Sequence, residues 1–547
     1  MKKYIGLSII ALSLGLTSCN SYLDKLPDNR MELSTPEDIK NLMVSAYPTT
    51  YPAYLLEMYS DNADECINTG WNEADRFQRQ AFHWDDITEI GASESPQTLW
   101  NSYYSAIAAC NASIQFIESQ SPTEQAAYAA QLGEALVCRA YCMFVMSTVF
   151  CQAYSPEHAS SDLGLPYPTA TEVKVGETYE RGTLAELYEK IDADLQRGLP
   201  LVTNEYSKPK FHFTADAANA FAARFYLNYC KFDKTIEYAN KVLGDYPQAK
   251  LRDWDYYNSL NANGMIQPEA FVAANEGANL LLQTVNSQWG AINGPYHLGD
   301  RYAHGNRIAN DESIARSGPW GATRGSDTDG FKYTLWYNDA LAKYMFRKIP
   351  YEFEYIDLQA GIGYAHAEYA VFTTDILLLE RAEAYALQGD LEAAVKDMNT
   401  EISVFHKRPT TLTVENIADF YNSIEYYQPT AATPKKQLHP VFTTIGADGS
   451  DQECVLQCLL HLRRILTMHE GFRMQDVKRY GITIYRRTMN SAYQITNVSD
   501  KMEARDPRQA IQLPQDVMSA GMDPNPRTLN VPQTEEYVTQ EWPVDNK

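Results

Sequence analysis

The residues best suited to ligand binding are tryptophans set among glycines in the middle of the chain. Glycine recurs from about residue 253 to residue 369, and Trp289 and Trp320 lie within this segment. Glycine at this density opposes long helices, so we expect loops and short strands here. Tryptophan joins a flat apolar ring to one polar group, which suits a half-wet surface. A long irregular segment carried on a rigid frame is a common place for binding function.

A second group of residues alternates in charge near the C-terminus. In the segment HEGFRMQDVKRYG, the residues Glu470, Arg473, Asp476 and Arg479 recur at intervals of three. On a helix this spacing predicts a row of ion pairs along the surface. Gly471 within the row indicates close approach by another element. The pattern therefore favours a structural role over a ligand site or a catalytic site.

Two further clusters contain residue types that can bind metals. Cys454, Cys458 and His461 share one face of a predicted helix, but the segment ECVLQCLLHL around them is otherwise apolar. Cysteine packs as a small hydrophobic residue, so we predict core rather than a metal site. Asp61, Asp64 and Glu65 form an acidic cluster of a kind that is usually solvated surface, although such groups can also hold a calcium ion.

The net charge and the absence of certain motifs exclude some classes of binding partner and of enzyme. The chain has 547 residues and a formal net charge of −24, so its surface repels nucleic acid, and we predict no nucleic-acid partner. The motifs G-x-S-x-G, H-E-x-x-H and the P-loop are absent from the sequence. Their absence excludes enzymes that depend on these motifs. It does not exclude a glycosidase, which needs only two well-placed carboxylates.

Helical periodicity predicts the elements that carry these residues. The segment TLWNSYYSAIAACNASIQFIES has one apolar stripe, and QAAYAAQLGEALVCRAYCMFVMSTVF is apolar over a wide arc that implies burial on more than one side. The segment 226–240 matches 385–399, and each follows a helix rich in alanine. Turns are expected at Cys230-Lys231 and around Gly389. A small-residue helix, a tight turn and an amphipathic helix together resemble a tetratricopeptide unit.

The N-terminus resembles the signal of a bacterial lipoprotein. Lys2 and Lys3 precede an apolar run that is too short to span a membrane, and the run ends in LTSC at Cys19. This segment is similar to a lipobox, in which the chain is cut before the cysteine and the cysteine is acylated. We predict a signal peptide at 1–18 and a lipidated tether at 19–37. Asn20 after the cysteine resembles lipoproteins that are sent to the outer membrane.

Several segments in order resemble the SusD/RagB family of surface nutrient-binding lipoproteins. They are YLDKLPDN after the lipobox, LWNSYYSAIAACN, GEALVCRAYCMFVMSTVF, YERGTLAELYEKIDADLQRGLPLV and HEGFRMQDVKRYG. The matching residues in three of them are Trp100, Tyr104, Ile107 and Asn111; Leu184, Tyr188, Ile191, Asp194 and Leu195; and Glu470, Gly471, Arg473, Asp476 and Arg479.

The resemblance implies a mainly α fold, a tetratricopeptide-like helical-repeat superhelix with a long loop-rich, glycine- and aromatic-rich insertion. We expect one domain at 38–547, with helix pairs at about 95–250 and 370–400 and a loop-rich ligand-binding region at about 253–369. Such a protein is lipid-anchored at the surface of the outer membrane of a Gram-negative bacterium. It is not an enzyme, uses no cofactor and delivers oligomeric nutrients, usually glycans, to a SusC-like TonB-dependent outer-membrane transporter.

A glycan site of this kind requires aromatic faces beside amide and charged groups. The residues expected to provide them are Trp320, Tyr296 and Trp289 as stacking platforms, with Trp71 and Arg76 behind them. Three alternatives stay open. The ligand could be a peptide, the chain could be a surface glycoside hydrolase or lyase, or the helical repeat could be a scaffold that binds only protein.

Overall fold

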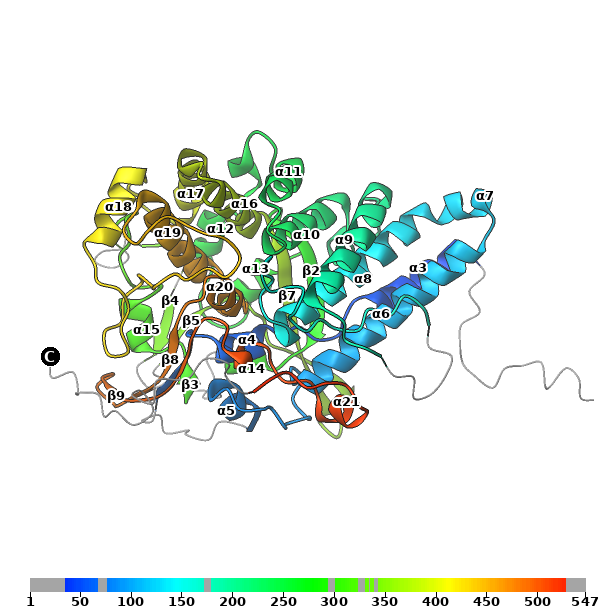
Figure 1. Ribbon diagram of the computed structural model, residues 1–547, viewed down its shortest axis with the longest axis horizontal. Coiled ribbons are helices and arrows are strands. Elements are labelled where there is room, and N and C mark those ends of the chain that lie inside the picture. Colours follow the sequence, from blue (N-terminus) through cyan, green and yellow to red (C-terminus); the bar gives the residue numbers. More distant parts are fainter. Residues whose placement is uncertain are drawn as a thin grey trace, which may run out of the picture.

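The fold is mainly helical, as predicted, and its helix pairs follow one another along the long axis of the molecule (Figure 1). The computed structural model describes residues 35–66, 76–171, 179–293, 301–322, 330–333, 343–527 and the backbone of 335–338. The pairs run from α6 and α8 at one end to α18 and α19 at the other. Their bounds are Pro96–Ser119 (α6), Ala129–Phe150 (α8), Leu184–Gly198 (α9), Ala215–Asn228 (α10), Phe232–Leu243 (α11), Thr374–Gln388 (α16), Leu391–Phe405 (α17), Val414–Asn422 (α18) and Asp451–Leu466 (α19).

The two copies of the predicted repeat form two matched helix pairs, α10 with α11 and α16 with α17. Both predicted turns are confirmed. In the second pair the turn is made by Gly389, whose φ of +87° lies in the left-handed region that glycine adopts without steric cost. In the first pair Cys230 adopts a φ of +61° at the corresponding position. A threonine caps the first helix of each pair, because Thr214 accepts from the backbone N–H of Ala217 and Thr373 from that of Ile376.

Helix α8 lies in the interior of the helical layer. It is buried on nearly every side, which confirms the interpretation of its wide apolar arc. The helical run Pro122–Phe150 that contains it is the one in the described ranges that is long and apolar enough to cross a membrane. Of its most apolar window, 89% is buried inside the protein, so this helix is explained as a core helix.

Three small sheets accompany the helices. The strands are Asp64–Cys66 (β1), Asn279–Asn286 (β2), Tyr302–Ala303 (β3), Leu335–Asn338 (β4), Lys343–Phe346 (β5), Glu352–Asp357 (β6), Ile362–Thr373 (β7), Ile484–Met489 (β8) and Ile495–Met502 (β9). Their orders are β3-β1-β8-β9, β2-β7-β6 and β4-β5. Pairing of β1 with β8 is parallel and joins an early segment of the chain to a late one.

Shorter helices connect these layers. They are Pro36–Met43 (α3), Ala53–Tyr59 (α4), Arg76–Phe82 (α5), Pro122–Gln125 (α7), Trp254–Ser259 (α12), Ile266–Phe271 (α13), Trp289–Ile292 (α14), Asn306–Asp311 (α15), Arg473–Arg479 (α20) and Gln515–Ser519 (α21). The region from 253 to 369 therefore contains short helices and strands β2 to β7, in keeping with the short elements that its glycines predict.

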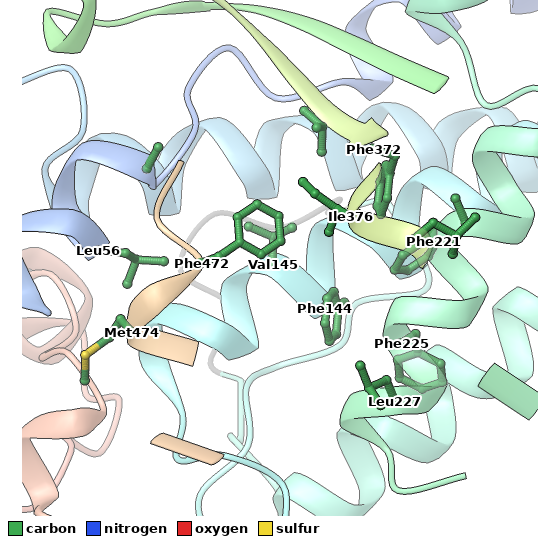
Figure 2. Packing of buried hydrophobic residues seen from close by; sticks show 14 of the residues in the cluster. Leu56, Phe144, Val145, Phe221, Phe225, Leu227, Phe372, Ile376, Phe472 and Met474 are labelled. Carbon is green, nitrogen blue, oxygen red and sulfur yellow. The ribbon is translucent and has the colours of Figure 1, made fainter. Parts of the chain in front are cut away.

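One continuous hydrophobic core joins the ends of the described chain. Figure 2 shows Leu56 of α4, Phe144 of α8 and Phe221 of α10 in the same cluster as Phe372 of β7 and Phe472 before α20. Because these residues come from distant parts of the sequence, the core fixes the N-terminal helices against the C-terminal ones.

Candidate ligand-binding site

The two described tryptophans that the sequence predicts as stacking platforms lie in the interior. Trp320 is 0% exposed and packs against His461 and Phe331 at centroid distances of 4.9 and 5.9 Å. Trp289 is 3% exposed, stacks on Tyr54 at 4.7 Å and donates its indole N–H to the carbonyl oxygen of His469 at 2.7 Å. Neither ring has an open face in this structure, so we correct the choice of these two residues as platforms.

The other predicted site residues are not brought together in the part of the chain that is described. Arg76 is exposed at the start of α5 and donates to the hydroxyl of Thr88. Tyr296, Trp71 and the predicted lipidation site Cys19 lie outside the described residues. A ligand site must therefore be sought from the surface of the described elements.

A pocket of about 720 Å³ lies over the outer face of α6, and we call it the α6 pocket. It is bounded by α6, by the segment 166–171 with Tyr179, and by the residues around α21. The lining residues are Trp100, Asn101, Tyr104, Ser105, Ala108, Asn111, Pro166, Pro168, Ala170, Thr171, Tyr179, Val517, Ala520, Gly521 and Met522. Its volume lies in the range typical of pockets for small ligands.

The sequence of α6 explains why these side chains face outward. Ser95 accepts from the backbone N–H of Thr98 and Pro96 takes the first helical position, which starts the helix. The predicted apolar stripe, from Leu99 to Ile114 at spacings of three and four, is buried as expected. The face bearing Asn101, Ser105 and Ala108 is thereby left exposed.

Tyr104 and Trp100 lie along one wall of the α6 pocket, and Trp100 is largely buried behind Tyr104 with 8% of its surface exposed. The rings of Trp100 and Tyr104 are 4.7 Å apart and inclined by 46°. Tyr104 is half-buried, and its hydroxyl donates to the carbonyl oxygen of Pro166 at 2.9 Å. Burial raises the pKa of Tyr104 well above its usual value, so the side chain stays neutral. The wall is held rigidly before any ligand arrives.

The polar groups of the α6 pocket divide into two kinds. Asn111 is committed to the fold, because its amide donates to Pro168 at 3.0 Å and its oxygen accepts from Arg139 at 2.8 Å. Asn101 and Ser105 are exposed, and no described residue forms a hydrogen bond with their side chains. These two groups are therefore available to a ligand. The described lining contains no Asp, Glu, His, Lys or Arg, so this part of the α6 pocket is uncharged.

A second pocket of about 680 Å³ lies between the segment 244–249 and helices α16 and α17, and we call it the α17 pocket. Tyr246 in its rim is 82% exposed. Arg381 in its wall is committed to Asp397, with two contacts of 2.8 Å. The α17 pocket thus offers the rings of Tyr246 and Tyr385 beside a charged wall, whereas the α6 pocket joins the ring of Tyr104 to unpaired polar groups.

The charged row near the C-terminus is structural, but the predicted geometry is wrong. Its four residues are buried and pair with other elements rather than with one another along a helix surface. The pairs are Glu470 with Lys348 (3.0 Å), Arg473 with Asp61 (2.6 Å), Asp476 with Arg463 (2.5 Å) and Arg479 with Glu383 (2.7 Å). Sequence periodicity places side chains on a face of a helix, but it does not show which element covers that face.

The acidic cluster at residues 61–65 is also buried, which corrects its interpretation as solvated surface. Asp64 pairs with Arg487 at 2.9 Å and Glu65 with Arg301 at 2.8 Å. Burial alone would raise the pKa of Asp61, but Arg464 and Arg473 hold that pKa well below its usual value. Arginines thus occupy the place that a cation would take. The described residues contain no group of three or more His, Cys, Asp or Glu that could hold a metal ion.

Cys454, Cys458 and His461 are buried on α19, as the apolar segment around them indicates. The ring nitrogen Nδ1 of His461 lies 3.1 Å from the hydroxyl of Tyr421. Burial lowers the pKa of His461 to about 3, so the ring is neutral at physiological pH. These three residues pack the interior of the α18–α19 pair.

Comparisons with a protein-family model and with solved structures support the mainly helical fold described above. A SusD-like family model described as "Starch-binding associating with outer membrane" matches residues 21–227. No curated protein matches the chain. Among solved structures, a SusD superfamily protein from Bacteroides thetaiotaomicron is 18% identical with a TM-score of 0.57, and the match covers 90% of this chain and 100% of that one.

Two structures from Bacteroides vulgatus are also similar. One is described as a SusD superfamily protein, with 16% identity, a TM-score of 0.57 and coverage of 91% of this chain and 100% of that chain. The other is described as a SusD-like carbohydrate binding protein, with 13% identity, a TM-score of 0.54 and coverage of 89% and 96%. These likenesses establish a SusD-like fold over nearly the whole chain, and the family model matches its N-terminal part, residues 21–227.

Proposed function

We propose that this protein binds glycans, as oligosaccharides or polysaccharides, in the α6 pocket. The observation that carries the proposal is the combination of the half-buried ring of Tyr104, supported from behind by Trp100, with the unpaired groups of Asn101 and Ser105 in a lining whose described residues are uncharged. A sugar ring has an apolar C–H face that loses water against an aromatic ring, and hydroxyls that need hydrogen-bond partners. The α6 pocket meets both requirements.

Delivery to a partner completes the proposed role. A protein anchored to the outer membrane through Cys19 would hold its ligand at the cell surface, and a SusC-like TonB-dependent transporter would take the ligand inward. The description of the family model and of the carbohydrate-binding relative from Bacteroides vulgatus support this direction.

The lining of the α6 pocket favours binding over hydrolysis. A glycosidase needs two carboxyl groups beside the scissile bond, about 5 to 9.5 Å apart. The described lining has none. The same neutrality weighs against cationic peptides as ligands, because nothing in the lining would pair with their charges.

The experiment fills each of the two pockets in turn with a tryptophan side chain and measures the effect on glycan affinity. The soluble chain from Asn20 onward is applied to an array of glycans and peptides, and the affinity of the best ligand is measured for two variants. Ala108→Trp fills the α6 pocket, and Ala249→Trp is the matched control that fills the α17 pocket; both alanines are exposed. We expect Ala108→Trp to abolish glycan binding and Ala249→Trp to leave it unchanged. The reverse result would assign the ligand to the α17 pocket, and release of shorter products would identify an enzyme.

A further inference from the structure

Strands β6 and β7 extend beyond the body of the protein as a two-stranded hairpin. In the sheet order β2-β7-β6, β6 is an edge strand, and all six of its residues are exposed. The last residue of β2 that pairs with β7 is Asn286, opposite His366. Residues 362–364 of β7 therefore have only β6 as a neighbour. We call residues 352–366 the projecting hairpin.

The projecting hairpin concentrates the exposed apolar side chains of the described chain. It holds six of the eleven large hydrophobic residues that are exposed in the described ranges. They are Phe353, Tyr355, Ile356, Leu358, Ile362 and Tyr364, and Leu358 at the turn is 77% exposed. Single apolar residues on a surface are ordinary, but six on one short hairpin, with Phe353 and Tyr355 on one face and Ile362 and Tyr364 on the other, indicate an interaction site. A two-stranded hairpin is also only marginally stable in water by itself, so it gains from being covered.

The arrangement of the rings favours a polypeptide over a sugar. Phe353 lies opposite Ala365 and Tyr355 opposite Gly363, so both rings stand on one face over small residues. The two rings are 4.8 Å apart and inclined by 68°, an edge-on arrangement that offers no flat platform for a pyranose. This face continues the side of β7 that holds Ala367 and Tyr369 in the core. The apolar face of the sheet thus runs out past the body of the protein.

The negative charge of the projecting hairpin indicates the chemistry of the segment that could bind to it. Glu352, Glu354 and Asp357 are acidic, and residues 352–366 contain no lysine or arginine. His366 lies 2.8 Å from the carboxylate of Glu354 and cannot offset all three. Carboxylates along an edge strand repel the same edge of a second copy and also repel an anionic membrane surface. They attract a segment that carries basic side chains.

We propose that the projecting hairpin docks an extended segment of a partner protein in which basic and apolar side chains alternate. The segment adds to the free edge of β6 through backbone hydrogen bonds. Its apolar side chains pack on Phe353 and Tyr355, and its basic side chains face the carboxylates on the other side. The proposal does not depend on the α6 pocket, so glycan binding is expected to be unchanged in hairpin variants.

The test uses two synthetic eight-residue peptides, one of alternating lysine and valine and one of alternating glutamate and valine. Binding to the soluble chain from Asn20 onward is measured by calorimetry, and amide hydrogen exchange locates the contact. We expect only the lysine peptide to bind and to slow exchange in residues 352–357. The variant Phe353→Ser with Tyr355→Ser should weaken binding at least tenfold. The melting temperature should fall only slightly, because Phe353 is 37% and Tyr355 53% exposed.

Two matched triple variants test whether binding depends on the carboxylates of the hairpin or only on the net charge of the protein. Glu352→Gln, Glu354→Gln and Asp357→Asn together remove three charges from the hairpin. Glu392→Gln, Asp419→Asn and Glu425→Gln remove three from exposed positions elsewhere. We expect the first set to abolish binding and the second to leave it intact. Equal losses in the two sets, or binding without protection of β6, would overturn the proposal. Binding of the hairpin to neutral phosphatidylcholine vesicles, lost in the Phe353 and Tyr355 variant, would replace the protein partner with a membrane.

Discussion

Arg473 and Asp61 form a buried ion pair with two parallel contacts of 2.6 and 2.9 Å, although 412 residues separate them in the sequence. Both side chains are almost wholly buried. Arg464 also donates to the backbone oxygen of Asp61 at 2.7 Å. The pair therefore ties the segment after α4 to α20, and it holds together the two ends of the chain around the core shown in Figure 2.

Replacing Arg473 by alanine should destabilise the protein strongly. The substitution leaves Asp61 buried with fewer partners, and breaking a buried pair from one side costs about 3–5 kcal/mol. Chemical denaturation of the soluble chain measures this change. The matched control is Arg197→Ala, which removes a 2.7 Å pair with Glu118 at the exposed surface and should cost less than about 1 kcal/mol. Equal costs for the two variants would contradict a locking role for Arg473.

Acid should weaken the same network. Burial alone would raise the pKa values of Glu312 and Glu383, but neighbouring cations hold both at about 2. The cations are Lys436, Arg487 and Arg464 for Glu312, and Arg463 and Arg479 for Glu383. A carboxylate with a lowered pKa in the folded state adds stability above its unfolded pKa, and this stability is lost as pH falls toward the folded pKa. We expect the free energy of unfolding to fall between about pH 5 and pH 2. A constant value over this range would contradict the prediction.

Local patterns predicted the helical part of the fold because neighbouring residues determine it. The match between 226–240 and 385–399 located two helix pairs and both of their turns, since helical spacing and turn chemistry depend on residues close in sequence. The apolar stripe of α6 likewise showed which side of that helix is buried. The opposite face of α6, which carries Asn101 and Ser105, was the feature of the sequence that could have located the α6 pocket.

Contacts between distant segments could not be predicted in the same way. Trp289 and Trp320 stand in glycine-rich sequence that suggests exposure, but Tyr54 and His461 cover them from elsewhere in the chain. The arginines that neutralise Asp61 and Asp64 come from α19, α20 and β8. Whether a polar or aromatic residue meets solvent depends on these tertiary neighbours, which a single sequence does not reveal.

The close approach predicted at Gly471 can be separated from its backbone conformation. Gly471 has a φ of +81°, and a Cβ atom there would lie 2.8 Å from the Cα atom of Ala53. Gly389 has a similar φ of +87° with nothing within 4 Å of such an atom. Gly389→Ala should therefore cost only the left-handed conformation, about 1–2 kcal/mol, and Gly471→Ala should cost clearly more. Thermal unfolding of both variants measures the difference. Equal losses would show that the contact with Ala53 can relax.

The polar groups of the α6 pocket provide the last prediction. Asn101→Ala and Ser105→Ala each remove one group that could bind a sugar hydroxyl, and a hydrogen bond of this kind contributes about 1 kcal/mol. Each variant should weaken glycan binding about fivefold. The melting temperature should not change, because no described residue bonds to either side chain. Thr171→Val is the matched control on the same lining, since its hydroxyl already donates to Gln115 at 2.8 Å. That variant should leave the affinity unchanged. If Thr171→Val weakened binding while Asn101→Ala did not, the ligand would lie at the opposite wall of the pocket.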